Sequence, residues 1–461
     1  MNRSFLFAIL LLLLPTLAGA AEESSPTAWE LLPYRIHILT AVEPSASLPP
    51  KLEQELPADL VARASAVVGG AWRLEASAAP VELRYRIMHS LGSLTAEDIA
   101  PASKKGDKVI LLGIAAGESG FVVRARELDM ATGLWNTTST RIVRQAGSVK
   151  QEALSCVLSA FAPQARIEKV EDKIVTLKLR AAALARREGE LPLFLVGTVF
   201  RPVLVKCDAS GVIQAGPAEP IAWTYLVPTE NKTASSPFTA RIETGLSGKV
   251  LPDYHPTRLR LALGVSPSRD STKIKLVAEG SAAPLEGYEV ASQEPEVAGK
   301  SGPIVSVGRS GPDGVVLVSV GTSTLRTLLI RHGEEILARL PVVPGLAEEI
   351  TISLADDRPR LAIESILNGI QDNLLDLVAR REVLVSRVKA ATNGGDSAGA
   401  AKLKDQLRLL PAAGLILAEL DKQQRPIEAL EGTARQKMQK RLAEIRKLAE
   451  KLKAENPADK L

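Results

Sequence analysis

The chain contains few of the residues from which catalytic and stacking sites are usually built. Its 461 residues include four histidines and two cysteines, and aromatic residues make up 3%. So few aromatics argue against a surface on which bases or sugars stack. The histidines are scattered, whereas a catalytic imidazole needs a partner within hydrogen-bond reach. We therefore expect each of them to be a surface or strand residue: His37, His89, His255 and His332.

Motifs whose spacing dictates a mechanism are also missing from the sequence. It has no Gly-x-Gly-x-x-Gly or Walker loop for phosphate, no His-Glu-x-x-His or Cys-x-x-Cys for a metal, and no Gly-x-Ser-x-Gly elbow. The adjacent carboxylates Glu348-Glu349 and Asp356-Asp357 would point apart on a strand, or favour the dipole near a helix start. The sequence thus predicts no catalytic residue, no metal site and no cofactor.

Long apolar runs are absent beyond the first twenty residues. Arg3, the apolar core Phe5–Leu14 and the small residues ending at Ala20 predict an export signal over residues 1–20, cleaved after Ala20. The alternative is an uncleaved anchor, but Pro15 favours cleavage, and a membrane span needs about 20 apolar residues. We expect a mature chain without a transmembrane segment that is periplasmic, associated with the cell envelope or extracellular.

Charge and composition indicate folded, multidomain protein. The net charge is only +4, which together with export argues against nucleic acid as a partner. Hydrophobic residues make up 46% and charged residues 24%, as is ordinary for globular proteins. At about 150 residues per domain, the mature length suggests three domains. The overall fold class we expect is multidomain α+β.

The two cysteines, Cys156 and Cys207, leave two interpretations open. In an oxidising compartment they could form a disulfide, which would stabilise the chain by about 4 kcal/mol in the loop-entropy model. Alternatively, Cys156 is a small buried hydrophobic residue on the apolar face of a helix over Glu152–Phe161. Neither interpretation implies catalysis, because no histidine is near in sequence.

Residues 30–163 are predicted to form an α/β domain. Strands and helices alternate before a meander and a last helix, which suits a sheet with helices on one face. The predicted elements are Tyr34–Thr40, Leu52–Val68, Trp72–Ala76, Val81–Leu91, Lys108–Ile114, Phe121–Asp129, Leu134–Val143 and Ser148–Phe161. This order, with the hairpin Asp129–Trp135, resembles small α/β modules of exported bacterial envelope proteins, such as the N-terminal domain of the Tol translocation protein B.

Residues 165–263 are predicted to form a β-rich domain, because short apolar or alternating runs are separated there by glycine and proline. The predicted strands are Ile167–Val170, Lys173–Leu179, Leu191–Val205, Val212–Ala215, Ile221–Val227 and Phe238–Ile242. Arg180–Arg187 is interpreted as a short helix or loop within this domain. Ser266-Pro267-Ser268 reads as a joint to the next domain.

Residues 271–345 are predicted to form a small antiparallel β-sandwich, with Asp313-Gly314 as a tight turn. Pro284–Val290, followed by Ser310–Gly314 and a valine-rich strand, resembles the carboxypeptidase regulatory-like or transthyretin-like β-sandwich, an Ig-like architecture. The family's threonine-aspartate pair is absent, and only the Asp313-Gly314 end of its turn is present. The resemblance implies a non-catalytic module for folding support or adhesion.

Residues 357–455 are predicted to be helical, as a helical hairpin or coiled-coil tail. A long helix should run from a cap at Asp357, with Pro359 in its first turn, to about Ala391. A second is expected over Ala398–Leu410, and a third from near Pro426. The last helix has an apolar stripe that comprises Met438, Leu442, Ile445, Ala449 and Leu452. Two interpretations of this stripe remain open: packing against neighbouring helices of the chain, or an interface with a partner.

The last helix is also locally basic. Arg435, Lys437, Lys440 and Arg441 could contact an anionic envelope polymer or lipid surface. The simpler interpretation is a solvated helix face, whose cations suit a helix C-terminus.

Two functions from different classes remain. The first is a non-enzymatic envelope or secreted scaffold, whose helical tail docks a protein partner or self-associates. The second is an envelope hydrolase or polysaccharide-active enzyme with a site assembled from residues distant in sequence. The second would require a concave pocket with convergent polar groups and perturbed pKa values.

Overall fold

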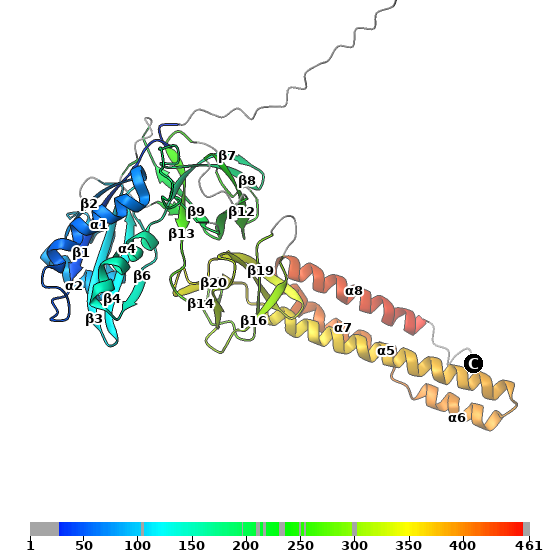
Figure 1. Ribbon diagram of the computed structural model, residues 1–461. Helices are drawn as coiled ribbons and strands as arrows, with labels where there is room; N and C mark the ends of the chain where they lie inside the picture. Colours follow the sequence, from blue (N-terminus) through cyan, green and yellow to red (C-terminus); the bar gives the residue numbers. More distant parts are fainter. Residues whose placement is uncertain are drawn as a thin grey trace, which may run out of the picture. The chain divides into compact units, whose positions relative to one another are not determined.

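The computed structural model describes residues 27–102, 106–195, 197–208, 213–214, 218–229, 236–248, 250–252, 255–296 and 302–454. It divides the chain into two compact units (Figure 1). Unit 1 comprises the described residues up to Asp270, together with Val320–Arg326 and Pro341–Ala347. Unit 2 comprises Ser271–Ser319, Thr327–Leu340 and the described residues from Glu348 onwards. The predicted signal sequence, including Ala20, lies outside the described residues.

Unit 1 begins with a mixed sheet whose strands lie in the order β2-β1-β3-β4-β5, with β6 also paired to β4. β1 is parallel to β2 and β3, and the later pairs are antiparallel. The strand bounds are β1 Tyr34–Val42, β2 Trp72–Ala78, β3 Lys108–Gly117, β4 Gly120–Asp129, β5 Leu134–Trp135 and β6 Ser139–Val143. The predicted hairpin is confirmed: Asp129 Oδ1 accepts bonds from the amide and hydroxyl of Thr132, both at 2.9 Å, and Leu128 pairs with Trp135.

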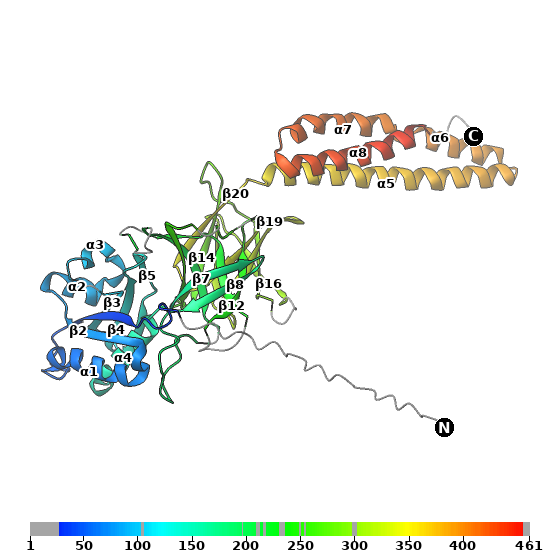
Figure 2. The ribbon, with the colours of Figure 1, turned by 90° about the horizontal axis from the view of Figure 1, so that it is seen from above.

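Helices cover both faces of this sheet, where the sequence predicted one (Figure 2). α1 (Leu52–Val68) and α4 (Val149–Ala160) pack on one face, and α2 (Val81–His89) and α3 (Ala96–Ile99) on the other. α1 fits because Leu52, Leu56, Leu60, Ala64 and Val68 recur every fourth residue and are all buried. β3 is buried on both sides, with Ile110 and Leu112 in one core and Val109 and Leu111 in the other. Its continuous apolar run requires cover on both faces.

The rest of unit 1 is chiefly an antiparallel barrel. Strands β9, β11, β12, β8, β7 and β13 pair in sequence, and β13 pairs again with β9 to close the sheet, while β10 adds to β9. The bounds are β7 Gln164–Glu171, β8 Ile174–Leu179, β9 Val199–Lys206, β10 Glu219–Pro220, β11 Thr224–Pro228, β12 Phe238–Thr244 and β13 Arg258–Val265. Phe194, Phe200 and Phe238 meet in its interior with ring centroids 5.2–5.8 Å apart. β13 was not predicted, and Val212 and Ala215 of the predicted strand Val212–Ala215 lie outside the described residues.

Two β-sheets consist mainly of unit 2 residues, with strand orders β17-β14-β20 and β16-β15-β18-β19. The bounds are β14 Ser271–Ala278, β15 Glu289–Gln293, β16 Ile304–Arg309, β17 Val315–Ser319, β18 Arg326–His332, β19 Glu335–Val342 and β20 Glu349–Leu354. β20 lies beyond the predicted sandwich and is parallel to β14, so the sheets are not purely antiparallel. The Asp313-Gly314 turn joins β16 to β17 in different sheets. Gly314 has φ 75°, and a Cβ there would lie 2.4 Å from the Leu276 carbonyl oxygen.

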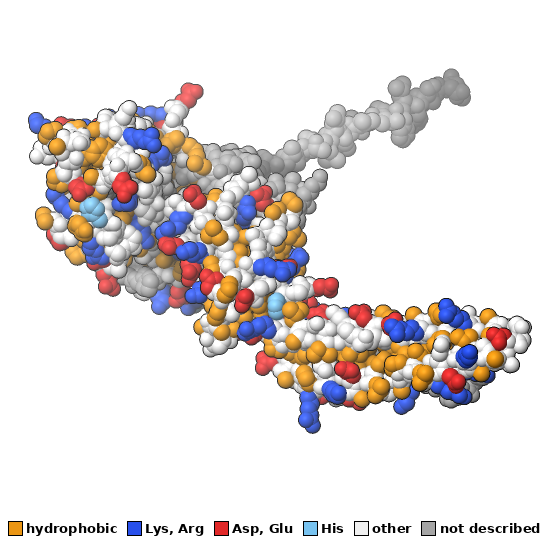
Figure 3. Space-filling model, turned by 90° about the horizontal axis from the view of Figure 1, so that it is seen from below, with side chains coloured by type: hydrophobic (Ala, Val, Ile, Leu, Met, Phe, Trp, Pro, Cys, Tyr) orange, Lys and Arg blue, Asp and Glu red, His pale blue; other side chains and the backbone are white. Residues whose placement is uncertain are grey.

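The C-terminal part of unit 2 is helical: α5 Arg358–Asn393, α6 Ser397–Arg408, α7 Ala413–Glu428 and α8 Gly432–Ala454. α6, α7 and α8 all contact α5. α7 was not predicted, and Pro426 lies inside its last turn instead of starting a helix. Apolar side chains form a band along this helical part on the face shown in Figure 3.

A buried polar network joins the sheets of unit 2 to the start of α5. Asp357 is at the N-cap, but its carboxylate makes no capping bond. Instead it accepts from Arg360 Nε at 2.7 Å and Nη2 at 2.6 Å, and lies 3.2 Å from His332 Nδ1. The His332 ring stacks on Tyr288 at 4.2 Å, and the Tyr288 hydroxyl accepts the Asp357 amide at 3.0 Å. The predicted cap residue therefore fixes a junction between β-sheet and helix.

Candidate functional site

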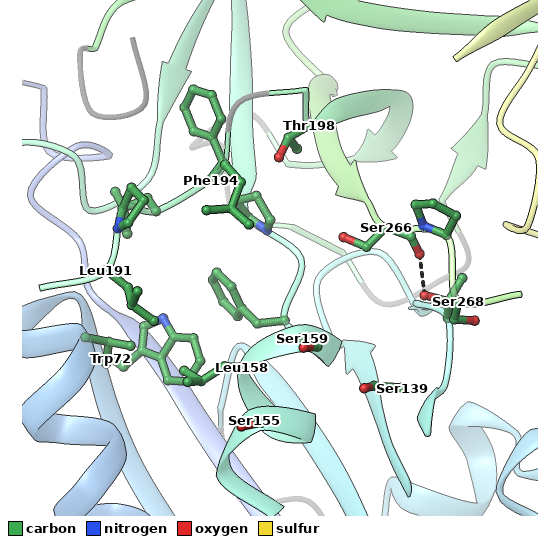
Figure 4. A pocket seen from close by; sticks show the side chains of 18 of the residues that line it. Trp72, Ser139, Ser155, Leu158, Ser159, Leu191, Phe194, Thr198, Ser266 and Ser268 are labelled. Atoms are coloured by element: carbon green, nitrogen blue, oxygen red, sulfur yellow. Dashed lines mark hydrogen bonds between the residues drawn. The ribbon is translucent and has the colours of Figure 1, made fainter. Parts of the chain in front are cut away.

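An open groove of about 630 Å³ in unit 1 is the strongest candidate for a functional site (Figure 4). It extends from Trp72 and Leu191 at one end to Ser139 and Ser268 at the other, with Leu158 and Ser159 between them. Its volume lies in the range of about 300–1,000 Å³ that is usual for ligand sites. The groove lies between the α/β part of unit 1 and the barrel.

Helix α4 supplies hydroxyl groups to the groove because of its periodicity. Ser155 and Ser159 are one turn apart and therefore lie on the same helix face. Ala153, Cys156 and Val157 face the sheet and are fully buried. After α4 the chain becomes extended at Phe161, whose ring contacts Trp72 at a centroid distance of 4.6 Å and Tyr34 at 5.0 Å. Trp72 and Phe161 give this part of the groove an aromatic lining.

The strand β6 and the segment before it form a second wall. Ser139, Thr140 and Arg141 all line the groove. Nearby, the Thr137 hydroxyl donates to the Ser266 carbonyl oxygen at 2.6 Å. That bond connects this wall to Ser266–Ser268, which line the groove from the segment after β13.

The third wall is the segment Leu191–Leu195, which the sequence predicted as the beginning of a strand. The strand β9 begins only at Val199. The Leu191 amide donates to the Val67 carbonyl oxygen at 3.0 Å, and Leu193 and Phe194 are buried. Leu191 and Leu195 are 43% and 65% exposed, so the segment presents apolar side chains to solvent.

A buried ionic cluster lies behind the aromatic lining. Lys108 Nζ donates to Glu127 Oε1 at 2.7 Å and to Asp129 Oδ2 at 3.0 Å, and is 5.3 Å from the Phe161 ring centroid. Glu127 Oε2 accepts the Ala162 amide at 3.1 Å. The cluster therefore holds in place the turn that carries Phe161. A cavity of about 30 Å³ borders Glu127 and Asp129, enough for about one water molecule.

Burial perturbs the pKa values of this cluster. Burial alone would lower the pKa of Lys108, but the charges of Glu127 and Asp129 outweigh it and raise this pKa above its ordinary range. Burial raises the pKa of Glu127 to about 7, although Lys108 opposes the change. Burial likewise raises the pKa of Tyr34 to about 12. Lys108 therefore stays charged at neutral pH, while Glu127 is close to titrating.

The Glu127→Gln variant should show what this carboxyl contributes to the pH dependence of stability. Between its ordinary pKa of 4.5 and about 7, the folded state binds a proton that the unfolded state has lost. The unfolding free energy of wild type minus that of Glu127→Gln should therefore fall as pH rises through this window, with a slope of up to about 1.4 kcal/mol per pH unit. Urea denaturation at half-unit pH steps measures the difference. A difference that is constant or rises with pH would contradict the assigned pKa.

The chemistry of the groove suits binding more than acid–base catalysis. No carboxylate, imidazole, thiol or amine is among its described lining residues. Arg141 is the one charged residue there, and it is 3.3 Å from Glu152. What the groove offers is hydroxyl groups and main-chain groups around apolar and aromatic side chains. The ionisable Lys108 cluster lies behind this lining, where its members bond to one another.

The structure does not form the disulfide that the sequence left open. Cys156 and Cys207 are both free and buried. Cys156 Sγ donates to the Val123 carbonyl oxygen at 3.6 Å, and Cys207 Sγ to that of Pro256 at 3.5 Å. Burial raises the pKa of the Cys156 thiol. Cys156 is thus the small buried residue of the alternative interpretation.

The residues suggested as a partner interface form the core of the helical region. Met438, Leu442, Ile445 and Leu452 are at most 9% exposed and cluster with Leu367, Leu374 and Leu420. Packing between the chain's own helices is therefore what the structure shows, because three helices together bury a stripe that no single helix could cover. An interface through these four residues would require the bundle to open.

The basic residues of α8 mostly bond within unit 2. Arg435 Nε donates to the Leu430 carbonyl oxygen at 2.7 Å, Lys437 pairs with Glu335, and Arg441 Nη1 donates to Glu364 Oε1 at 3.1 Å. Lys440 is exposed. A contact with an anionic surface would have to compete with these bonds.

The groove could not be predicted from the sequence, because its walls come from segments far apart in the chain. One signal was present: the hydroxyl-rich run Thr137–Thr140 next to an edge strand. Across the described residues, no group of histidine, cysteine, aspartate and glutamate is arranged to hold a metal ion. None of the described helices is long and apolar enough to cross a membrane.

The architecture is that of a multidomain, β-rich chain with a helical C-terminal region. No family model matches the chain, and no curated protein matches it. TolB from Acinetobacter baumannii is similar over 70% of this chain and 96% of that chain, with 12% identity and a TM-score of 0.17. The group B streptococcus pilus 2b backbone protein is similar over 55% of this chain and 100% of that chain, with 11% identity and a TM-score of 0.16. BcpA, the major pilin subunit of Bacillus cereus, is similar over 54% of this chain and 71% of that chain, with 9% identity and a TM-score of 0.13.

Proposed function

We propose that this chain is an exported, non-enzymatic scaffold of the cell envelope, and that its groove binds a segment of a protein partner. The observation that supports the proposal is the lining of the groove, where hydroxyl groups and exposed apolar side chains meet without an acid–base pair. Export is supported by the sequence of residues 1–20 alone. The hydrolase alternative would need a general acid or base, and the described lining residues supply none.

A peptide segment fits this lining better than a small charged ligand. Serine and threonine hydroxyls both donate and accept hydrogen bonds, so they can satisfy main-chain amides and carbonyls alike. Leu158, Leu191 and Leu195 give apolar side chains of the ligand a surface to cover, at roughly 25 cal/mol per Å² buried. A single guanidinium would give a multiply charged ligand little compensation.

The two units take different parts in this proposal. Unit 1 carries the recognition groove, and the sheets of unit 2, which we interpret as a transthyretin-like, Ig-like module, act as a spacer. The helical region is the proposed element for self-association or docking. It would act through side chains on its surface, such as Leu375 and Val383, which are 55% and 51% exposed.

Blocking the groove tests the proposal. Octapeptides selected from a displayed random library against the full chain provide the probe, and isothermal titration calorimetry measures their affinity. Ser159→Trp places an indole in the groove from the exposed side of α4, and we expect it to weaken binding by about tenfold or more, because a filled groove excludes the ligand.

Gln151→Trp is the matched control, since Gln151 is exposed on the same helix but does not line the groove. It should leave affinity within about twofold, as expected for a surface change away from the site. Peptides that bind both variants equally well would place their site elsewhere. Failure to select any peptide above a protein-free control would also count against the proposal.

A further inference from the structure

Building on the proposed function, we propose that the groove binds its peptide by strand addition, with the peptide main chain pairing along the edge of β6. β6 is the last strand of its sheet and pairs with β4 on one side. No other described strand pairs with it. In an antiparallel sheet such an edge leaves the N–H and C=O groups of alternate residues directed outwards.

The groove reaches the edge of β6, and not merely one of its faces. Successive residues of a strand point to opposite faces of the sheet. Ser139, Thr140 and Arg141 are successive, yet all three line the groove. A cavity that contacts residues of both orientations must adjoin the edge between them. The main-chain groups of β6 are therefore within reach of a ligand in the groove.

This edge lacks three features that commonly prevent pairing. Natural edge strands are often blocked by proline, lysine or a β-bulge. The sequence Ser139–Val143 contains neither proline nor lysine. Its register with β4 is continuous, from Ser139 opposite Ala125 to Val143 opposite Phe121. The edge is therefore regular over five residues, a length of about 17 Å.

The residues around the edge of β6 indicate which peptide side chains would fit there. Ser266–Ser268 also line the groove, and the Thr137–Ser266 bond ties them to the segment before β6. On the side of α4, alternate peptide side chains would meet Leu158, so apolar residues fit there. Arg141 is the one charged residue of the described lining, which favours an uncharged or acidic peptide over a basic one.

Methylation of the peptide main chain tests strand addition. Each amide of a selected octapeptide is N-methylated in turn, and affinity for the full chain is measured by calorimetry. Strand addition predicts a period of two: methylation at every second central residue lowers affinity by about tenfold, because a hydrogen bond is lost, and methylation at the residues between changes it little. Binding should also slow hydrogen exchange of the segment that contains β6.

The outcomes separate this inference from the proposed function. One outcome is that peptides no longer bind the Ser159→Trp variant, while the effect of N-methylation shows no period of two. The groove would then remain the binding site, and strand addition would be overturned. Peptides indifferent to Ser159→Trp would overturn both. A peptide-free chain that dimerises through β6, seen as protection of that segment which disappears on dilution, would identify a second copy as the occupant and overturn the peptide assignment.

Discussion

Replacing Lys108 by methionine is expected to lower the free energy of unfolding of unit 1 by about 3–5 kcal/mol, because it leaves two buried carboxylates without their cation. Lys108, Glu127 and Asp129 are 0%, 1% and 3% exposed. Methionine fills much of the space of the lysine stem but supplies no charge. The Phe161 ring, 5.3 Å from the ammonium, would lose its cation as well.

Tryptophan fluorescence during urea unfolding measures this effect selectively. All four tryptophans, Trp29, Trp72, Trp135 and Trp223, belong to unit 1. Lys150→Met is the control, because Lys150 forms a more exposed ion pair with Glu55 at 3.0 Å and should cost no more than about 1 kcal/mol. Equal losses in the two variants would mean that the buried cluster contributes no more than an ordinary surface pair.

A second substitution separates unpaired charge from lost packing. Lys108→Met combined with Glu127→Gln should recover part of the stability, because a buried amide costs less than a buried carboxylate. The glutamine oxygen can still accept the Ala162 amide that Glu127 accepts at 3.1 Å. The opposite result would be a double variant whose unfolding free energy is lower than that of Lys108→Met. It would show that lost packing, and not an unpaired charge, explains the stability lost in Lys108→Met.

Elements with strong local signals could be predicted from the sequence. The helix Leu52–Val68 has the predicted bounds, because its apolar residues recur every fourth position between prolines and glycines. The strand beginning at Tyr34 and the hairpin at Asp129 are determined by alternation and by turn chemistry within a few residues. In each case the signal comes from residues close together in sequence, and the tertiary structure agrees with the local preference.

Features that depend on distant segments could not be predicted. β20 follows Pro344-Gly345, which was interpreted as the end of the β region, and its parallel pairing with β14 joins residues about 76 positions apart. The helix α7 (Ala413–Glu428) begins after Pro411 and includes Pro426, although the prolines suggested breaks there. In both cases burial against other segments outweighed a local stop signal.

The candidate site was also beyond local prediction, although part of its supporting cluster left a trace. Glu127 and Asp129 are two apart on a strand and so share a face, which would have to be buried beneath the helices. That pattern calls for a nearby cation, but nothing local identifies Lys108 as its source. The segment Leu191–Leu195 is apolar, as a strand would be, and only the barrel shows that it lines a groove.

Unit 2 has its own buried cation, and replacing Arg360 by methionine should lower the unfolding free energy of this unit by about 3–5 kcal/mol. Arg360 is 4% exposed, and its Nη2 donates to the His332 carbonyl oxygen at 2.9 Å as well as to Asp357. The hydrogen bonds with Asp357 raise the pKa of Arg360 above its ordinary value, so it keeps its charge. Its loss would remove the guanidinium that pairs with the Asp357 carboxylate, a group that is 7% exposed.

Hydrogen exchange along α5 measures this loss and shows where it begins. Arg380→Met on the same helix is the control, because the Arg380–Asp376 pair, at 2.8 Å, is 67% and 57% exposed and should contribute at most about 1 kcal/mol. We expect Arg360→Met to speed exchange first in the opening turns of α5 and in β18, where the network bonds, and only then in the outer half of α5. Faster exchange confined to the outer half, or equal effects of the two substitutions, would show that the Asp357 network does not hold α5 to the sheets. We expect this order because α6 contacts α5 independently of the junction, so part of α5 keeps a packing partner when the Asp357 network is lost.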